Sequence, residues 1–142
     1  MPPTAPTVPS TSPTTDRRLS RTGLAGWIVS GVVALFNLID GVTKMAHTDG
    51  SVAGTVSLGF PEHFLFGIGL TLVICTLLFL IPFTSLIGAV LLTGYLGGAV
   101  AIQVRVESMN ALFALALGIL VWVGMLLRDA RLRALLRESL IG

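Results

Sequence analysis

Four apolar runs, at residues 24–43, 64–81, 85–104 and 109–127, constrain this chain more than any other feature, because each is 18 to 20 residues long. A helix rises about 1.5 Å per residue, so such a run matches a hydrocarbon core roughly 30 Å thick. Backbone amides find no water to bond in lipid, and the alternation typical of a membrane β-barrel is missing. We therefore predict an all-α integral membrane protein, a four-helix bundle.

Composition supports this class and divides the chain into three parts. The sequence is 54% hydrophobic and only 11% charged, outside the usual range of soluble domains. Residues 1–22 contain five of the seven prolines and many Thr and Ser, which predicts a disordered cytoplasmic tail. Residues 23–128 form the transmembrane domain. The first apolar run follows a long polar segment, so we interpret it as a retained helix and not as a cleaved signal peptide.

Residues 129–142 carry leucines at helical spacing, with arginines on another face. This pattern predicts an amphipathic C-terminal helix lying on an anionic membrane surface. A docking helix for a cytosolic partner is the alternative. The leucines are Leu132, Leu135, Leu136 and Leu140, and the arginines are Arg133 and Arg137.

Basic residues are concentrated at the two ends of the chain, and this bias predicts the topology. Seven of the nine Lys and Arg residues precede the first run or follow the fourth. By the positive-inside rule, both termini are then cytoplasmic, as an even number of spans requires. The turn around Pro82 faces the same side. The long connection after the first span and the short one before the fourth face outward.

A polar ridge ends the first apolar run. Asn37, Asp40 and Lys44 are separated by three and four residues, so they share one helical face, and Asp40 can pair with Lys44 one turn later. A charge inside a bilayer costs a few kcal/mol unless it faces protein or water. We therefore expect Asp40 to point into the bundle.

Other polar side chains are expected at the same outer level: His47, Asp49, Glu62, His63, Gln103, Arg105, Glu107 and Asn110. Their convergence predicts a polar pocket at the outer mouth of the bundle. The segment SVAGTVSLGF would cover it as a short interfacial helix, because Val52, Val56 and Phe60 recur every four residues. A solvated loop face with one structural ion pair is the alternative.

Small residues in the third span predict a close helix contact. Gly94 and Gly98 form a GxxxG pair, and Ala101 extends the same face. We expect this face to pack inside the bundle, with a contact between two copies of the chain as the alternative. Gly97 beside Gly98 would leave room for a flat ligand.

Catalytic and metal-binding patterns are not found in the sequence. The single cysteine, Cys75, lies in the middle of the second span, where we expect an inert packing residue. His47 and His63 do not have a spacing typical of zinc ligands, and the spans do not offer paired histidines for haem. We therefore assign no catalytic residue, no metal, no built-in cofactor and no nucleic-acid partner. Whether the chain belongs to an enzyme, at most as an accessory subunit, stays open.

Several segments together resemble the DoxX-like family of small bacterial membrane proteins. They are WIVSGVVALFNLIDGVTKM, LGFPEH, CTLLFLIPFTSLIGAVLLTGYLGGAVAIQVR and LVWVGMLLRDARLRALL, which cover nearly everything after the proline-rich tail. The resemblance implies a four-helix bundle in the bacterial cytoplasmic membrane. Gln103 stands where many members carry a histidine. Because glutamine neither titrates nor ligates iron or copper in the usual way, the resemblance carries no such role to this position.

Two functional hypotheses follow. Members of the wider DoxX and DoxD group are linked to sulfur oxidation with quinone as electron acceptor, so the resemblance implies a subunit that binds a quinone or similar lipophile and assists a partner oxidoreductase. The alternative is a non-enzymatic scaffold, homo-oligomer or small permease in the lipid bilayer. The candidate ligand-binding residues are Asn37, Asp40, Lys44, His63, Tyr95, Gly98, Gln103 and Arg105.

Overall fold

The computed structural model describes residues 21–142, so the expected disorder of residues 1–20 lies outside the described part of the chain. Its elements, in chain order, are α1 (Arg21–Met45), α2 (Asp49–Ser57), η1 (Glu62–Phe64), α3 (Leu65–Leu80), α4 (Ser85–Arg105), α5 (Asn110–Arg128) and α6 (Ala130–Ile141). Within the described residues the fold is entirely helical. Arg21 and Thr22 already belong to α1, so the first helix begins earlier than the apolar run that predicts it.

Four helices of the described region, α1, α3 with η1, α4 and α5, are long and apolar enough to cross a membrane. α1 packs against α3 and α5, and α4 packs against the same two helices, so the four form a ring. The core contains Leu72, Cys75, Phe79, Leu92 and Val121, which confirms Cys75 as a buried packing residue. Many large apolar side chains are exposed on the outside, as a lipid-facing surface requires.

The helices end where local chemistry prevents their continuation. α3 stops before Pro82, which disfavours helical geometry at the residue before it. Asp129 separates α5 from α6, and its Oδ1 accepts hydrogen bonds from the amides of Arg131 (2.9 Å) and Leu132 (3.3 Å). This carboxylate is therefore the N-cap of α6.

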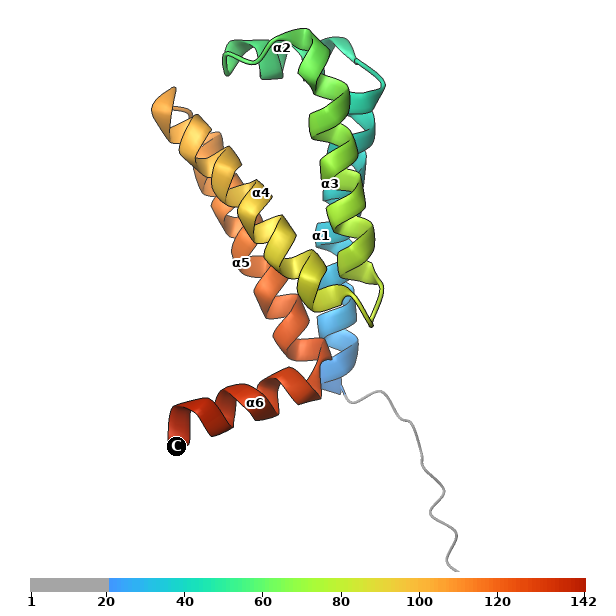
Figure 1. The fold of residues 1–142 in the computed structure, drawn as a ribbon, viewed down its shortest axis with the longest axis vertical. Coiled ribbons are helices and arrows are strands. Elements are labelled where there is room, and N and C mark those ends of the chain that lie inside the picture. The colour runs from blue at the N-terminus through green and yellow to red at the C-terminus, as the bar shows by residue number, and fades with distance from the viewer. Residues whose placement is uncertain (1–20) are drawn as a thin grey trace, which may run out of the picture.

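The bundle opens toward one end (Figure 1). There α4 and α5 lean away from α1 and α3, and α2 lies across the opening, whereas α6 crosses the opposite end. Close contacts between helix backbones explain why the end crossed by α6 is narrow. A Cβ on Gly26 of α1 would come within 2.5 Å of the Arg128 amide nitrogen, and a Cβ on Gly88 of α4 within 2.2 Å of the Phe79 amide nitrogen. Only glycine lets these backbones approach so closely.

At the wide end, aromatic side chains separate α1 from α5. The rings of Phe36 and Phe113 meet edge to face, with centroids 4.9 Å apart. Glycines let the helices approach closely at one end of the bundle, and aromatic side chains hold them apart at the other. The pair of α4 and α5 therefore diverges from the pair of α1 and α3.

The glycines predicted to mediate packing do not do so within the chain. A Cβ built on Gly94 or Gly98 would meet no atom within 4 Å, and Ala101 is exposed. The reason is that all three lie on the flank of α4 away from the core face, which carries Leu92 and Leu96. The close contacts use other small residues, among them Gly26 and Ser30 of α1 and Gly124 of α5.

Candidate functional site

The site is a cavity of about 470 Å³ between the four long helices, at the end covered by α2. Its walls are mostly apolar and include Phe36, Ile68, Leu72 and Phe113. Polar side chains occur among these walls on α1, α2, α4 and α5. A volume of roughly 300–1,000 Å³ with apolar walls and a few convergent polar groups is typical of small-molecule sites.

Asn37 is the most deeply buried polar residue of this cavity. Its side chain is only 2% exposed, and its Nδ2 has no hydrogen-bond partner among the described residues. Gln103 of α4 also lines the cavity, and its Oε1 is buried and likewise lacks a partner there. A buried amide without a partner costs on the order of 1–3 kcal/mol, and a ligand that bonds to it would recover part of that cost.

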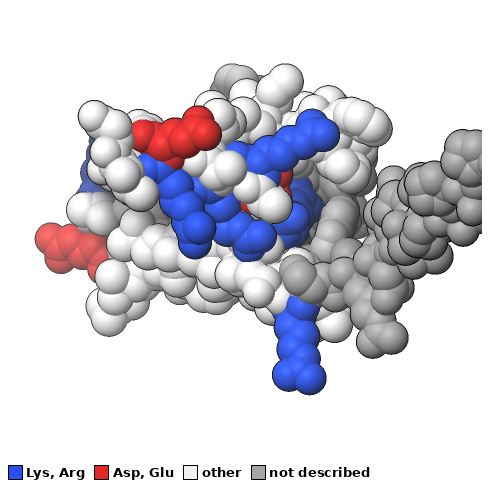
Figure 2. Space-filling model, turned by 90° about the horizontal axis from the view of Figure 1, so that it is seen from below, with Lys and Arg blue, Asp and Glu red and all other residues white. Residues whose placement is uncertain are grey.

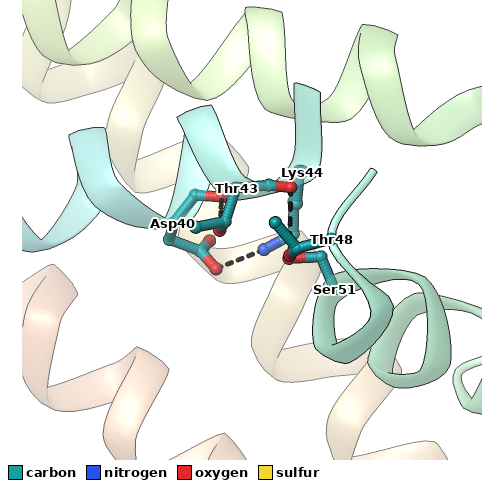
Figure 3. Close-up of polar contacts among 5 residues, drawn as sticks. All are labelled: Asp40, Thr43, Lys44, Thr48 and Ser51. Atoms are coloured by element: carbon teal, nitrogen blue, oxygen red, sulfur yellow. Dashed lines mark hydrogen bonds and ion pairs between the residues drawn. The ribbon is translucent and has the colours of Figure 1, made fainter. Parts of the chain in front are cut away.

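Asp40 and Lys44 form an ion pair on the wall of the same cavity (Figure 3). Lys44 Nζ donates to Asp40 Oδ1, as the spacing predicts. The Thr43 hydroxyl donates to the Asp40 carbonyl oxygen (3.0 Å), and the Thr48 hydroxyl donates to Ser51 Oγ (3.0 Å) at the start of α2. The Thr48 amide donates to the Thr43 carbonyl oxygen (3.2 Å), which connects the polar end of α1 to the N-cap residue of the helix that covers the cavity.

A second, more polar cavity of about 540 Å³ adjoins the first. It is lined by Gly50, Ser51, Gly54 and Ser57 of α2. Both cavities share Asp40, Lys44, Thr55, Leu58, Gln103 and Asn110. The ion pair and the side-chain amides of Gln103 and Asn110 therefore lie between an apolar cavity and a polar one.

The structure brings together six of the eight candidate ligand-binding residues. Asn37, Asp40, Lys44, Tyr95, Gly98 and Gln103 line the apolar cavity. His63 and Arg105 line neither cavity. His63 is exposed in η1 with its ring against Phe64, and Arg105 is exposed because it lies two residues, or about 200° of helix, beyond the inward-facing Gln103.

The covering segment differs from its prediction. α2 ends at Ser57, and Gly59 adopts a left-handed φ of 89°, so Phe60 is not part of a helical repeat with Val52 and Val56. Thr55, Leu58 and Phe60 line the cavity, whereas Val56 is exposed. Thr55 and the wall aromatics Phe36 and Phe113 are site residues that sequence reasoning missed. Thr55 gives no signal in an apolar repeat, because its side chain is polar.

A separate cluster, in which one arginine packs against two aromatic rings, lies at the α6 end of the bundle. The Arg128 guanidinium is positioned over the rings of Trp27 (4.8 Å) and Phe79 (4.7 Å), and its Nη2 donates to the Phe79 carbonyl oxygen. Phe79 lies in the last turn of α3, where carbonyls lack intrahelical donors. Arg128 therefore joins α1, α3 and α5 and caps α3. In the sequence, Arg128 is recognisable only as one of the basic residues that flank the spans.

The fold and the site first define a class, a multi-pass membrane protein built as a helical bundle with an internal, mostly apolar cavity. Residues 28–124 match the model of the DoxX-like family, and the chain belongs to that family. Comparisons with curated proteins and with solved structures gave no significant match.

Proposed function

We propose that this protein binds a quinone, or a similar small lipophile with a polar ring, in the apolar cavity. In this role it serves as the membrane subunit of an oxidoreductase whose flavin or metal is carried by a partner protein. The observation that carries the proposal is the Asn37 amide, which is buried beside apolar walls and whose Nδ2 has no hydrogen-bond partner among residues 21–142.

The chemistry of the lining suits both redox forms of a quinone. The carbonyl oxygens of the oxidised ring accept hydrogen bonds, which Asn37 Nδ2 and the Tyr95 hydroxyl on the same cavity wall can donate. The hydroxyls of the reduced ring donate, and Gln103 Oε1 and the Asp40 carboxylate accept. Lys44 would stabilise negative charge on a partly reduced ring.

Among residues 21–142, no group of three or more His, Cys, Asp and Glu side chains is arranged to hold a metal ion. In the proposed complex, this chain binds and orients the quinone, while the partner supplies the electron-transfer centre.

The membrane orientation forms part of the proposal. We place both termini and α6 on the cytoplasmic side of a bacterial inner membrane, with α2 on the outer side. Lys and Arg side chains gather at the α6 end, as Figure 2 shows. They belong to Arg21, Arg128, Arg131, Arg133 and Arg137. α6 lies across the long helices (Figure 1), which is the orientation of a helix in the plane of an anionic leaflet.

The scaffold or permease reading is less well supported. In that alternative Asp40 and Lys44 form only a structural ion pair, but both residues are on α1, so the pair does not join two helices. The adjoining polar cavity is the observation that keeps a permease as the second candidate.

Mass spectrometry of organic extracts tests the proposal directly. The full chain is purified in mild detergent from its native membrane, beside Asn37→Leu and Asp49→Leu variants. We expect a stoichiometric quinone in the wild type and in Asp49→Leu, because Asp49 lines neither cavity, and its loss in Asn37→Leu. Wild-type protein that is empty and does not take up added quinone would overturn the proposal.

The partner is tested by native electrophoresis of solubilised membranes. A flavin fluorescence or metal stain that comigrates with this chain supports the oxidoreductase assignment. Migration of the chain without any redox group would leave quinone binding without an attached enzyme and would overturn that assignment.

A further inference from the structure

The apolar cavity reaches the outer surface of the bundle on one side. Gly94 and Gly98 line it, although both are exposed. On the core face of the same helix, Leu92 is fully buried and Leu96 is 5% exposed. A residue that lines the cavity and is also exposed marks the edge of an opening in the cavity wall.

The orientation of α4 shows between which helices this opening lies. Gly88 packs against the backbone of α3, and Tyr95, two turns later, projects from the same face. Thr93 marks the other flank, because its hydroxyl accepts a hydrogen bond from Trp122 Nε1 of α5 (2.9 Å). Gly98 lies three residues after Tyr95, on the flank away from Thr93. The opening is therefore between α3 and α4, with Ile68 of α3 on the opposite wall.

No side chain of α4 fills this opening at Gly94 or Gly98. A Cβ placed on Gly94 or Gly98 would meet no atom within 4 Å, whereas a Cβ on Gly88 would collide with α3. Between α1 and α5, Phe36 and Phe113 also line the cavity and are 42% and 51% exposed, but their rings pack against each other and bridge the gap. The cavity is thus bridged by aromatic rings on one side and edged by glycines on the other.

From this geometry we infer that the ligand is an amphiphile with a long apolar tail, which leaves the cavity between α3 and α4 and extends into the bilayer. The inference rests on the proposed function and specifies its ligand class. The polar head bonds to Asn37 Nδ2 and Gln103 Oε1, which lack partners among the described residues. The tail passes Gly94 and Gly98, where the absence of side chains leaves a path, and remains in the hydrocarbon phase it would otherwise occupy.

The tail path separates this ligand class from two others. A water-soluble solute would approach through the polar cavity under α2 and would not need a glycine-edged opening to lipid. A short lipophile without a tail would fit the cavity but would leave the opening between α3 and α4 unused.

The test compares two quinones with identical rings, one carrying a decyl chain and one a methyl group. Binding to the detergent-purified full chain is measured for the wild type, Gly94→Trp and Gly97→Trp. Gly94 lines the cavity, whereas Gly97 is equally exposed, also has no atom within 4 Å of its Cβ position, and does not line it. Thermal unfolding and size-exclusion profiles confirm that both variants fold. Gly98→Leu replaces Gly94→Trp if that variant does not fold.

We expect Gly94→Trp to weaken decyl-quinone binding by about tenfold or more and methyl-quinone binding by less than about twofold. Gly97→Trp should change neither. Equal binding of the decyl quinone by Gly94→Trp and wild type would overturn the tail path while the proposed function stands, and so would equal weakening of both quinones. Wild-type protein that binds neither quinone would overturn the proposed function itself.

Discussion

Gly41 of α1 and Gly69 of α3 lie backbone to backbone near the end of the bundle that carries α2. A Cβ added to Gly69 would stand 2.5 Å from the Gly41 carbonyl oxygen, and one added to Gly41 would stand 2.7 Å from Val73 Cγ2. Because this contact holds α1 against α3, it also positions Asn37 and Asp40 on the cavity wall.

The first prediction concerns this contact. Gly69→Ala should destabilise the protein by about 1–3 kcal/mol, because a methyl group forces two packed backbones apart. Thermal unfolding in detergent measures the effect. Gly67→Ala is the matched control, since a Cβ there meets nothing within 4 Å. If both variants melt like the wild type, the two helices do not pack as described.

The second prediction concerns Arg128. Arg128→Met should destabilise the fold by about 2 kcal/mol or more, because it removes two cation–π contacts and leaves the Phe79 carbonyl oxygen without its donor. Arg137→Met removes the same charge from an exposed position on α6 and should change stability by less than about 0.5 kcal/mol. Equal unfolding temperatures for the two variants would contradict the role of Arg128 in joining three helices.

The third prediction compares two aspartates. Asp40→Leu should reduce quinone binding by about tenfold or more, since it removes a cavity carboxylate and leaves Lys44 without its partner. Asp49→Leu should leave binding unchanged, because Asp49 is exposed and lines neither cavity. Binding isotherms on purified protein give both values. Negligible effects from both substitutions would remove Asp40 from the site.

The fourth prediction concerns topology. With Cys75 replaced by alanine, Ser51→Cys should react with an impermeant thiol reagent added to intact cells, because α2 is assigned to the outer side. Ser139→Cys on α6 should react only after lysis. The reverse pattern would show that the charge bias of the termini orients the chain the other way.

The fifth prediction concerns α6. Spin labels at Leu140→Cys and Glu138→Cys, again in a Cys75→Ala background, differ by two residues and so lie on different sides of the helix. Leu140 is 84% exposed, and membrane contact would bury it. We expect the Leu140 label to contact oxygen in the bilayer and the Glu138 label to contact an aqueous nickel complex. Equal aqueous contact at both sites would indicate a helix that projects away from the membrane.

Much of the candidate site was predictable, because the pairing of Asp40 with Lys44 depends only on spacing along one helix. Gln103 and Tyr95, also predicted as ligand-binding residues, lie on the cavity wall, since polar side chains within apolar spans have few other environments. His63 and Arg105, also predicted as ligand-binding residues, line neither cavity. Each lies at the same level of the bundle as the cavity, but its side chain points away from the cavity. The position of a residue along a helix axis does not determine which side of the helix its side chain occupies.

The sequence by itself determined the four long helices, the breaks at Pro82 and Asp129, the amphipathic C-terminal helix and the family. Only the tertiary structure decided which small residues pack, where the bundle opens, and that Arg128 joins three helices. The physical reason is that lipid and protein interior are both apolar. An apolar pattern therefore predicts that a helix spans, but it does not distinguish the side that faces a neighbouring helix from the side that faces lipid.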